Sequence, residues 1–203
     1  MSRKAEAVDA ARAARAHVSD TLAAAAALHE RLRAGSLEPV VAAADAVVAA
    51  LKSGGKVLLF GNGGSAADAQ HVAAELVGRF ERDRAALAAI ALTADTSVLT
   101  AVANDVGYER AFARQIEALG RPGDVAFGIT TSGRSPNVAA ALEAAKANGL
   151  RTVAITGRDG GLIGPMADVH VNVPDDSTAR VQEAQRTLLH AICALVERAF
   201  GGN

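Results

Sequence analysis

The architecture of this chain follows most directly from the sequence KVLLFGNGGSAADAQHVAAE, which runs from Lys56 to Glu75. Its apolar start predicts a buried strand, its glycines predict a tight turn, and its alanine-rich remainder predicts a helix. This order points backbone N–H groups and the positive end of a helix dipole at one place. Such a place suits a phosphate group, although a glycine-rich turn is also common as an ordinary connection.

Polar side chains in and after this turn add chemistry to the predicted anion site. Asn62 and Ser65 can donate hydrogen bonds to an anion that the glycines allow close to the backbone. His71 and Glu75 are four residues apart, so they lie on one face of the predicted helix. A histidine beside a carboxylate can bind a metal ion or move protons.

Four further apolar runs follow, at intervals that leave room for crossover helices. They lie at 87–92, 124–129, 151–156 and 169–173. Helical patterns occupy 97–104, 109–119, 137–148, 162–167 and 178–200. Repeated βαβ units of this kind predict an α/β fold, with a five-stranded parallel sheet in the flavodoxin-like order 2-1-3-4-5 and helices on both faces.

Two more helices are predicted before the first strand. Residues 2–33 have apolar positions at helical spacing among alanines and charges, and Gly35 ends this helix. Ser36 is expected to cap a second helix over 37–52. We predict one domain, in which residues 1–35 form a helix used in oligomerisation and residues 36–200 form the core.

Composition excludes several classes of protein. The 203 residues are 50% hydrophobic but only 3% aromatic, with no Trp and a net charge of −1. A nucleic-acid-binding surface needs basic residues and often aromatic stacking platforms, so nucleic acid is not expected as a partner. The alanine runs at 23–27 and 41–50 are too short and too polar for a membrane span. One cysteine and a start without an apolar signal segment favour the cytoplasm.

A second polar loop is predicted at the same edge of the sheet. The sequence TTSGRSPN at 130–137 follows the third strand, and strands one and three flank the point where the strand order reverses. Ser135 before Pro136 is typical of a helix N-cap, which alone is its simplest interpretation. Together, the hydroxyls of this loop and the glycine-rich turn indicate a phosphate cradle.

Four stretches together resemble a known family: 61–75, 91–105, 130–137 and 178–183. Over residues 30–198 the chain resembles the sugar isomerase (SIS) domain and, within it, the phosphoheptose isomerases. The resemblance implies conversion of sedoheptulose 7-phosphate to D-glycero-D-manno-heptose 7-phosphate through an enediol, the first step of ADP- and GDP-heptose biosynthesis. The serine-rich loop is typical of any SIS domain, whereas His71, Glu75, Gln182 and His190 together are specific for the isomerases.

The resemblance also implies roles for individual residues. It makes Glu75 and His190 the acid–base pair, and it implies one zinc ion per subunit held by His71, Glu75, Gln182 and His190. Such nitrogen and oxygen ligands bind zinc less tightly than thiolates, so loss on purification is conceivable. The implied substrate contacts are Asn62, Gly63, Gly64, Ser65, Glu75, Asn104, Asp105, Thr130, Thr131, Ser132, Ser135 and Gln182.

Three positions depart from the family pattern. Thr130 stands where Ser is usual, Arg134 where Asn is common, and Gln185 where His is frequent. The first keeps its hydroxyl and the second adds a cation beside the predicted phosphate, whereas an accessory role at 185 becomes doubtful. Cys193 follows His190 by three residues, but we expect it to be a small buried side chain rather than a ligand.

Helical geometry raises a question about the implied zinc ligands. Gln182 and His190 are eight residues apart, which is about 12 Å along one unbroken helix. Either the helix is irregular before His190 or one ligand comes from a neighbouring subunit. Apolar stripes on the N-terminal helices also favour a homo-oligomer, and the resemblance implies a homotetramer with sites at its interfaces.

Two other classes share this fold. One is a non-catalytic SIS protein that binds a replication initiator, in which the His71, Glu75, Gln182 and His190 set is expected to be missing. The other is a sugar-phosphate-sensing regulator, which usually has an attached DNA-binding domain. The first 35 residues are too short and too little basic for such a domain.

Overall fold

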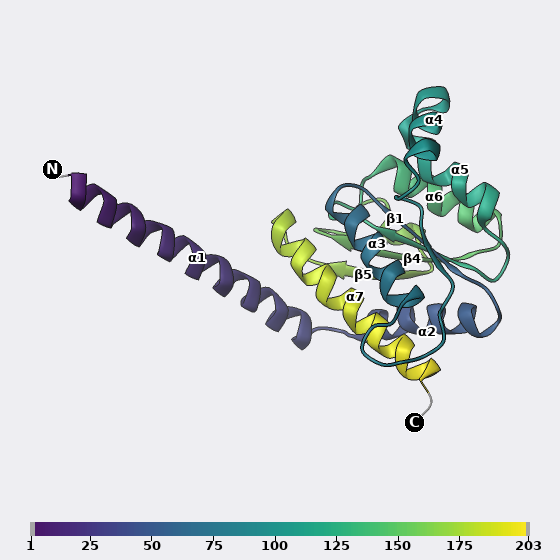
Figure 1. The fold of residues 1–203 in the computed structure, drawn as a ribbon, viewed down its shortest axis with the longest axis horizontal. Helices are drawn as coiled ribbons and strands as arrows, with labels where there is room; N and C mark the ends of the chain where they lie inside the picture. The colour runs from purple at the N-terminus through teal and green to yellow at the C-terminus, as the bar shows by residue number, and fades with distance from the viewer. Residues whose placement is uncertain (1–2, 202–203) are drawn as a thin grey trace. The chain divides into compact units, whose positions relative to one another are not determined.

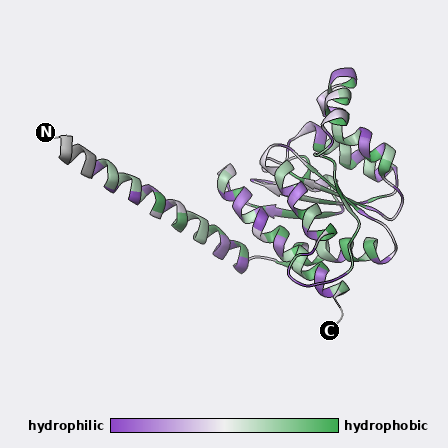
Figure 2. Cartoon of the chain, in the orientation of Figure 1, coloured by the Kyte–Doolittle hydropathy of each residue, from purple (hydrophilic) through white to green (hydrophobic). Residues whose placement is uncertain are grey.

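The first unit of the protein is one long helix. The computed structural model describes residues 3–201 and divides by its internal contacts into the units Met1–Ser36 and Leu37–Asn203. Helix α1 (Arg3–Ala34) forms the first unit (Figure 1) and ends just before Gly35, as predicted. Its predicted start at Ser2 lies outside the described residues. Val18 and Leu22 are 58% and 66% exposed, and apolar and polar residues alternate along the helix (Figure 2).

The second unit is built on a parallel sheet with the predicted strand order. The strands are β1 (Val57–Gly61), β2 (Ala89–Ala91), β3 (Val125–Ile129), β4 (Arg151–Gly157) and β5 (Val169–Val173). They pair in the order β2-β1-β3-β4-β5, and every pair is parallel. The fold is therefore α/β, as the spacing of the apolar runs predicts.

Helices cover both faces of this sheet (Figure 1). Alternate side chains of a strand point to opposite faces, so Val57 and Leu59 join one core cluster while Leu58 and Phe60 join the other. The first cluster includes residues of α2 (Glu38–Lys52), α3 (Gly64–Val77) and α7 (Thr178–Phe200), and the second includes residues of α5 (Ala111–Leu119) and α6 (Pro136–Ala147). Burial on both sides explains why β1 and β3 are continuous apolar runs.

The remaining elements agree with the predicted pattern except at three places. They are α2 (Glu38–Lys52), α3 (Gly64–Val77), α4 (Thr96–Val106), η1 (Tyr108–Arg110), α5 (Ala111–Leu119), α6 (Pro136–Ala147), η2 (Gly164–Met166) and α7 (Thr178–Phe200). The prediction of a helix over 162–167 is wrong, because only the short 3₁₀ turn η2 forms there. Leu37 rather than Ser36 is the N-cap of α2. Strand β2 is also shorter than the run at 87–92, although Leu92 N still donates to Leu59 O.

The polypeptide turns very tightly where β1 ends. A Cβ atom at Gly61 would lie 2.7 Å from Ile129 O and 2.8 Å from Ser65 Cβ. Only glycine allows this approach, which brings the loop after β1 against the end of β3. The two polar loops therefore leave the sheet at the same edge, side by side.

No single helix among residues 3–201 is both long and apolar enough to cross a membrane. The segments Asp9–Ala34 and Glu38–Lys52 reach the length and apolar composition of a membrane-spanning segment only when the two are taken together.

Candidate active site

Two asparagines join the loops that follow β1 and β3. Asn62 Nδ2 donates to Asn137 Oδ1 and Asn137 Nδ2 donates to Asn62 Oδ1, each at 2.8 Å. The hydroxyl of Tyr108 also donates to Asn62 Oδ1, at 3.1 Å. Asn137 is 3% exposed, so this amide pair is a fixed part of the fold. Asn62, predicted as a substrate contact, thus uses its amide to hold the second loop in place.

Hydroxyl groups gather in the second loop. Thr130 Oγ1 lies 3.1 Å from Ser135 Oγ and 3.4 Å from Ser132 Oγ. Ser135 occupies the N-cap position of α6, but its hydroxyl contacts Thr130 rather than the first turn of the helix. Ser135 is therefore the N-cap residue, as predicted, but its side chain does not cap the helix. Thr131, also predicted as a substrate contact, lies between these residues and is half-buried.

Neighbouring segments hold this hydroxyl loop from two sides. Gln185 is fully buried in α7, and its Nε2 donates to Thr130 O at 3.1 Å. Ile163 N donates to Gly133 O at 3.0 Å from the loop after β4. Gly133 has a φ of +64°, and a Cβ atom there would collide with Gly160 O. Gln185, which stands where His is frequent in the family, thus has a structural role, because it holds the carbonyl group of Thr130.

Arg134 points toward the loop after β4. Its Nη2 donates to Asp159 Oδ2 at 2.7 Å, and both side chains are more than half exposed. Hydrogen bonding from Gly161 N and the charge of Arg134 lower the pKa of Asp159. The cation that departs from the family pattern is therefore paired with a carboxylate.

Helices α3 and α7 lie parallel, and paired contacts run along their shared boundary, which we call the α3–α7 seam. At its start, a Cβ atom on Gly64 would collide with the amide of Gln182. One turn later, Arg186 donates to the buried Asp68, with Nε at 2.9 Å from Oδ1 and Nη2 closer still. Further along, the ring of His71 meets that of His190.

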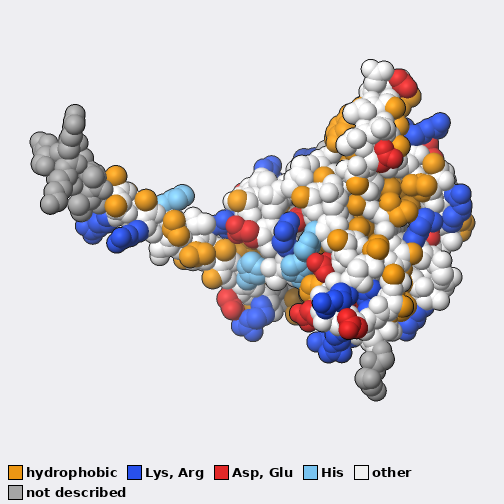
Figure 3. Space-filling model, in the orientation of Figure 1, with side chains coloured by type: hydrophobic (Ala, Val, Ile, Leu, Met, Phe, Trp, Pro, Cys, Tyr) orange, Lys and Arg blue, Asp and Glu red, His pale blue; other side chains and the backbone are white. Residues whose placement is uncertain are grey.

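The two histidines and Glu75 form a compact acid–base group. His71 Nε2 lies 2.7 Å from His190 Nε2 and 3.4 Å from Glu75 Oε1. The side chains of His71 and Glu75 are 35% and 20% exposed, so a bound molecule can reach them. Figure 3 shows histidine atoms at the surface of the second unit, near acidic and basic side chains. The prediction that His71 and Glu75 share one helical face is confirmed.

The structure separates Gln182 from this group. Helix α7 is one continuous α-helix from Thr178 to Phe200, so the first of the two alternatives, an irregular helix before His190, is wrong. Gln182 contacts Gly64 at the start of the seam, whereas His190 meets His71 seven residues further along α3. His71 and His190 come together within one chain, so no neighbouring subunit is needed to supply His190.

The remaining predicted residues differ in their surroundings. Ser65 is buried at the start of α3, whereas Gly63 and Gly64 are exposed there. Asn104 and Asp105 are exposed near the end of α4, where Asn104 Nδ2 donates to Asp105 Oδ1 at 2.8 Å. None of the residues of α4, all within the described part of the chain, is buried.

Cys193 is a buried residue of the core, as predicted. It is 1% exposed in α7, and burial together with the charges of Glu75 and Glu197 raises its pKa to about 12. The group at this position is therefore a thiol at neutral pH, and thiolate ligation is disfavoured.

Two hollows lie near the seam and the sheet edge. One of about 400 Å³ opens over the start of the seam and is lined by Gly64, Asp68, Gln182 and Arg186 among others. Another of about 660 Å³ lies between β2, α4 and α5, with Ile90, Val98 and Leu119 in its wall. The first shares Gly64 and Gln182 with the predicted substrate contacts. The second is mostly apolar and lacks the acid–base group, so we assign the chemistry to the seam.

Several supporting residues have weak sequence signals. Asn137 follows Pro136 in the second loop and resembles an ordinary helix-start residue. Asp68 and Arg186 are 118 residues apart, so no local pattern joins them. Each becomes recognisable only when the two loops and the two helices are brought together.

Comparison with known proteins gives a consistent result. The SIS domain family profile matches residues 22–157. A phosphoheptose isomerase of Roseiflexus sp. (strain RS-1) is 56% identical over 161 residues, which are 79% of this chain and 82% of that protein.

Solved structures give the same result. The phosphoheptose isomerase GmhA of Neisseria gonorrhoeae has 45% identity and a TM-score of 0.85, over 90% of this chain and 98% of that one. The phosphoheptose isomerase of Francisella tularensis has 34% identity and a TM-score of 0.88, over 91% and 98%.

We predict that His170 makes stability depend on pH. Its Nε2 lies 2.6 Å from Thr156 Oγ1, its ring packs against Gly160 and Gly164, and burial lowers its pKa below 6.5. The unfolded chain therefore binds the extra proton more readily, so stability from His170 is present above pH 6.5 and is lost as the pH falls toward the folded pKa. Denaturant unfolding of His170→Gln between pH 7.5 and 5.5 should show a smaller loss of free energy than the parent chain.

The matched control is His17→Gln, because His17 is exposed on α1. It should keep the parent slope of unfolding free energy against pH. Equal slopes for both variants would contradict the assignment to His170.

Proposed function

Since this chain belongs to the SIS domain family and, within it, to the phosphoheptose isomerases, we propose that it interconverts sedoheptulose 7-phosphate and D-glycero-D-manno-heptose 7-phosphate. The enzyme is an aldose–ketose isomerase. The observation that carries the proposal is the contact of His71 and Glu75, on the helix that follows the glycine-rich turn, with His190 on α7. Homologues named phosphoheptose isomerase at more than half identity disfavour the non-catalytic and regulatory alternatives.

The length of α3 suits a long sugar phosphate. The seven residues from Gly64 to His71 rise roughly 10 Å along the helix axis. A phosphate at the start of α3 and a carbonyl carbon beside His71 would therefore be separated by a distance comparable to an extended seven-carbon chain. Backbone N–H groups and the helix dipole favour the phosphate at the first position.

Isomerisation moves a proton between C1 and C2 of the sugar through an enediol. We assign Glu75 as the base that takes the proton from one carbon and returns it to the other. His190, with Nε2 in the same group, is assigned to ring opening and to the movement of the hydroxyl proton. Hydroxyl donors and the amide of Gln182 at the start of the seam hold the other end of the substrate, which keeps C1 and C2 at Glu75.

We further propose that one zinc ion per subunit takes part. Two imidazole nitrogens and one carboxylate oxygen converge at the seam, and this donor set suits zinc. In the part of the chain that the structure describes, no group of three or more His, Cys, Asp or Glu is already arranged for a metal ion. His71 Nε2 and His190 Nε2 contact each other at 2.7 Å, so these two rings would have to move apart to hold the ion together with Glu75. Zinc would polarise the substrate carbonyl as a Lewis acid.

Assembly and compartment complete the proposal. We propose a homotetramer, supported by the exposed Val18 and Leu22 on α1, which leave an apolar stripe open to a partner. Light scattering of the purified chain tests this assembly. A cytoplasmic location is supported by the single cysteine, which is buried and reduced.

We predict that Glu75→Gln abolishes turnover of sedoheptulose 7-phosphate while substrate binding is largely kept. The amide keeps the shape of the side chain but cannot accept a proton from carbon, and loss of a general base costs on the order of 10²–10⁴ in rate. Steady-state kinetics in zinc-supplemented buffer measure this effect. A kcat equal to that of the parent would remove Glu75 from proton transfer.

We predict that Ser135→Ala raises KM more than it lowers kcat. Its hydroxyl belongs to the cluster around Thr130, which contacts the phosphate in this proposal. The loss of one such contact, about 1.4 kcal/mol, corresponds to a roughly tenfold higher KM. Ser132→Ala should behave similarly. Ser53→Ala removes a hydroxyl at the other end of the sheet, bonded to Ala50 O, and should leave both constants unchanged.

We predict that a chelator removes both zinc and activity, and that added zinc restores activity. Elemental analysis should find one zinc ion per chain in the active enzyme, and His71→Gln should lower that content. Full activity in protein shown to be free of zinc would remove the metal from the mechanism and leave the roles of Glu75 and His190 to be tested separately.

A further inference from the structure

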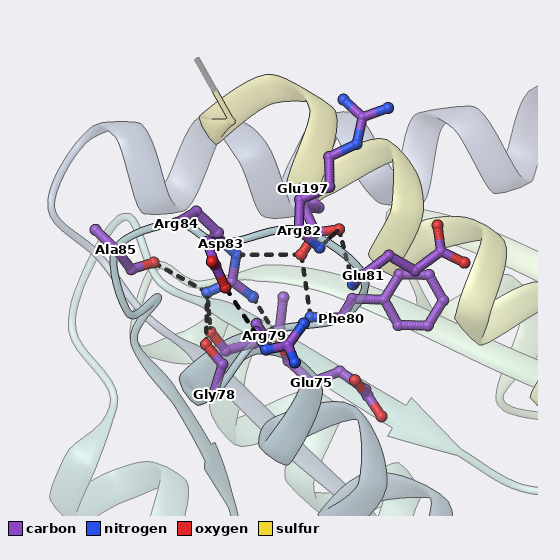
Figure 4. A network of polar contacts seen from close by, with 11 residues as sticks. Glu75, Gly78, Arg79, Phe80, Glu81, Arg82, Asp83, Arg84, Ala85 and Glu197 are labelled. Atoms are coloured by element: carbon purple, nitrogen blue, oxygen red, sulfur yellow. Dashed lines mark hydrogen bonds and ion pairs between the residues drawn. The ribbon is translucent and has the colours of Figure 1, made fainter. Parts of the chain in front are cut away.

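A buried ion pair between Arg84 and Glu197 lies near the end of α3 (Figure 4). Arg84 Nε is 3.7 Å from Glu197 Oε1, and the two side chains are only 2% and 4% exposed. Transferring two charges from water into the protein interior costs free energy, so a buried ion pair is often no more stabilising than apolar side chains of the same size. A role for this pair is therefore better sought in the backbone groups that Arg84 and Glu197 bind than in its contribution to stability.

Arg84 supplies hydrogen bonds to the end of the helix that contains Glu75. Its Nη2 donates to Glu75 O at 2.6 Å, and its Nη1 donates to Leu76 O at 2.8 Å. Nη1 also reaches Ala85 O at 2.9 Å and Gly78 O at 3.3 Å. The last carbonyl groups of a helix have no partners within the helix, and the negative end of its dipole attracts a cation. Arg84 thus fixes the turn that ends with the proposed base.

Glu197 holds the segment that follows this turn. Its Oε1 accepts from Phe80 N, and its Oε2 accepts from Glu81 N and Arg82 N, all at 3.0 Å. Burial alone would raise the pKa of Glu197, but these hydrogen bonds and the charge of Arg84 lower it. The carboxylate stays ionised and keeps the backbone of this segment bound to α7.

Phe80 connects this segment to the second proposed catalytic residue. Its ring centroid lies 5.5 Å from that of His190, with the planes tilted by 41°. Because Glu197 binds the backbone N–H of Phe80, the same carboxylate sets where that ring lies. One ion pair therefore reaches Glu75 through its carbonyl oxygen and His190 through Phe80.

We propose that Arg84 and Glu197 are positioning residues for the isomerase reaction, which together hold Glu75 and His190 in the geometry for proton transfer. This inference rests on the proposed function. Arg84 fixes the axial position of the Glu75 turn, and Glu197 fixes both Arg84 and the Phe80 ring. A small misplacement of a reacting group can cost about 100-fold in rate, so the effect should appear in kcat.

The test uses two variants of the full chain and one matched control. Glu197→Gln removes one charge, and the double variant Arg84→Met/Glu197→Gln removes both, so no buried charge is left unpaired if the single variant fails to fold. The control is Asp124→Asn. Asp124 is also a buried carboxylate that accepts from two backbone N–H groups and binds a cation, Lys56, but it lies at the opposite end of β3.

The kinetic readout is the separation of kcat from KM. Glu197→Gln and the double variant should each lose about 10- to 100-fold in kcat for sedoheptulose 7-phosphate. Their KM should stay within about threefold of the parent value, because the proposed phosphate contacts at the start of α3 are unchanged. Asp124→Asn should lose thermal stability and keep kcat. An unchanged kcat in the folded double variant overturns the proposal, and so does an equal loss of kcat in Asp124→Asn.

A second readout does not need activity. The ring protons of His190, assigned with His190→Gln and observed by NMR in zinc-free, substrate-free protein, are shifted by the nearby Phe80 ring. Glu197→Gln and the double variant should change the chemical shift of the His190 ring protons, and Asp124→Asn should not. An unmoved resonance overturns the proposal. If the parent chain lacks isomerase activity, the proposed function fails by that result, while the NMR comparison still decides whether the ion pair positions the histidine.

Discussion

The parallel contact of α3 with α7 is the constraint on which the site depends. The sheet brings both helices to one face, but only specific contacts set how far one is displaced along the other. The buried carboxylate of Asp68 binds Arg186 between the Gly64–Gln182 contact and the His71–His190 contact. A shift of one helical turn, about 5.4 Å, would separate the two histidines completely. Burial of Asp68 penalises such a shift, because it would leave the charge unpaired.

A second constraint comes from the parallel sheet. Strands that run in the same direction deliver their following loops to the same edge, so the loops after β1 and β3 meet there although 75 residues separate Asn62 from Asn137. Reciprocal amide hydrogen bonds then fix the distance between the loops. The proposed phosphate end of the site therefore depends on the sheet, whereas the acid–base group depends on the α3–α7 seam.

The sequence predicts the sheet order and the two loops well, because apolar runs and glycine turns are local signals. It also predicts that His71 and Glu75 share a face, since helical periodicity is fixed. It does not predict which residue of α7 meets His71, because periodicity gives the face of a helix but not its axial displacement against another helix. That displacement depends on Asp68 and Arg186. The short η2 has a similar origin, since Ile163 N bonds to Gly133 O in another loop.

The two ends of α3 differ in polarity and therefore have different roles in the proposed site. The start of α3 has the positive end of the helix dipole, which favours the phosphate that we propose to bind there without any charged side chain. The end of α3 has the opposite polarity, so a cation is favoured there, and Arg84 occupies that place. The same helix can thus hold the proposed phosphate at its start and present Glu75 near its end, where the buried Arg84, paired with Glu197, fixes the last turn.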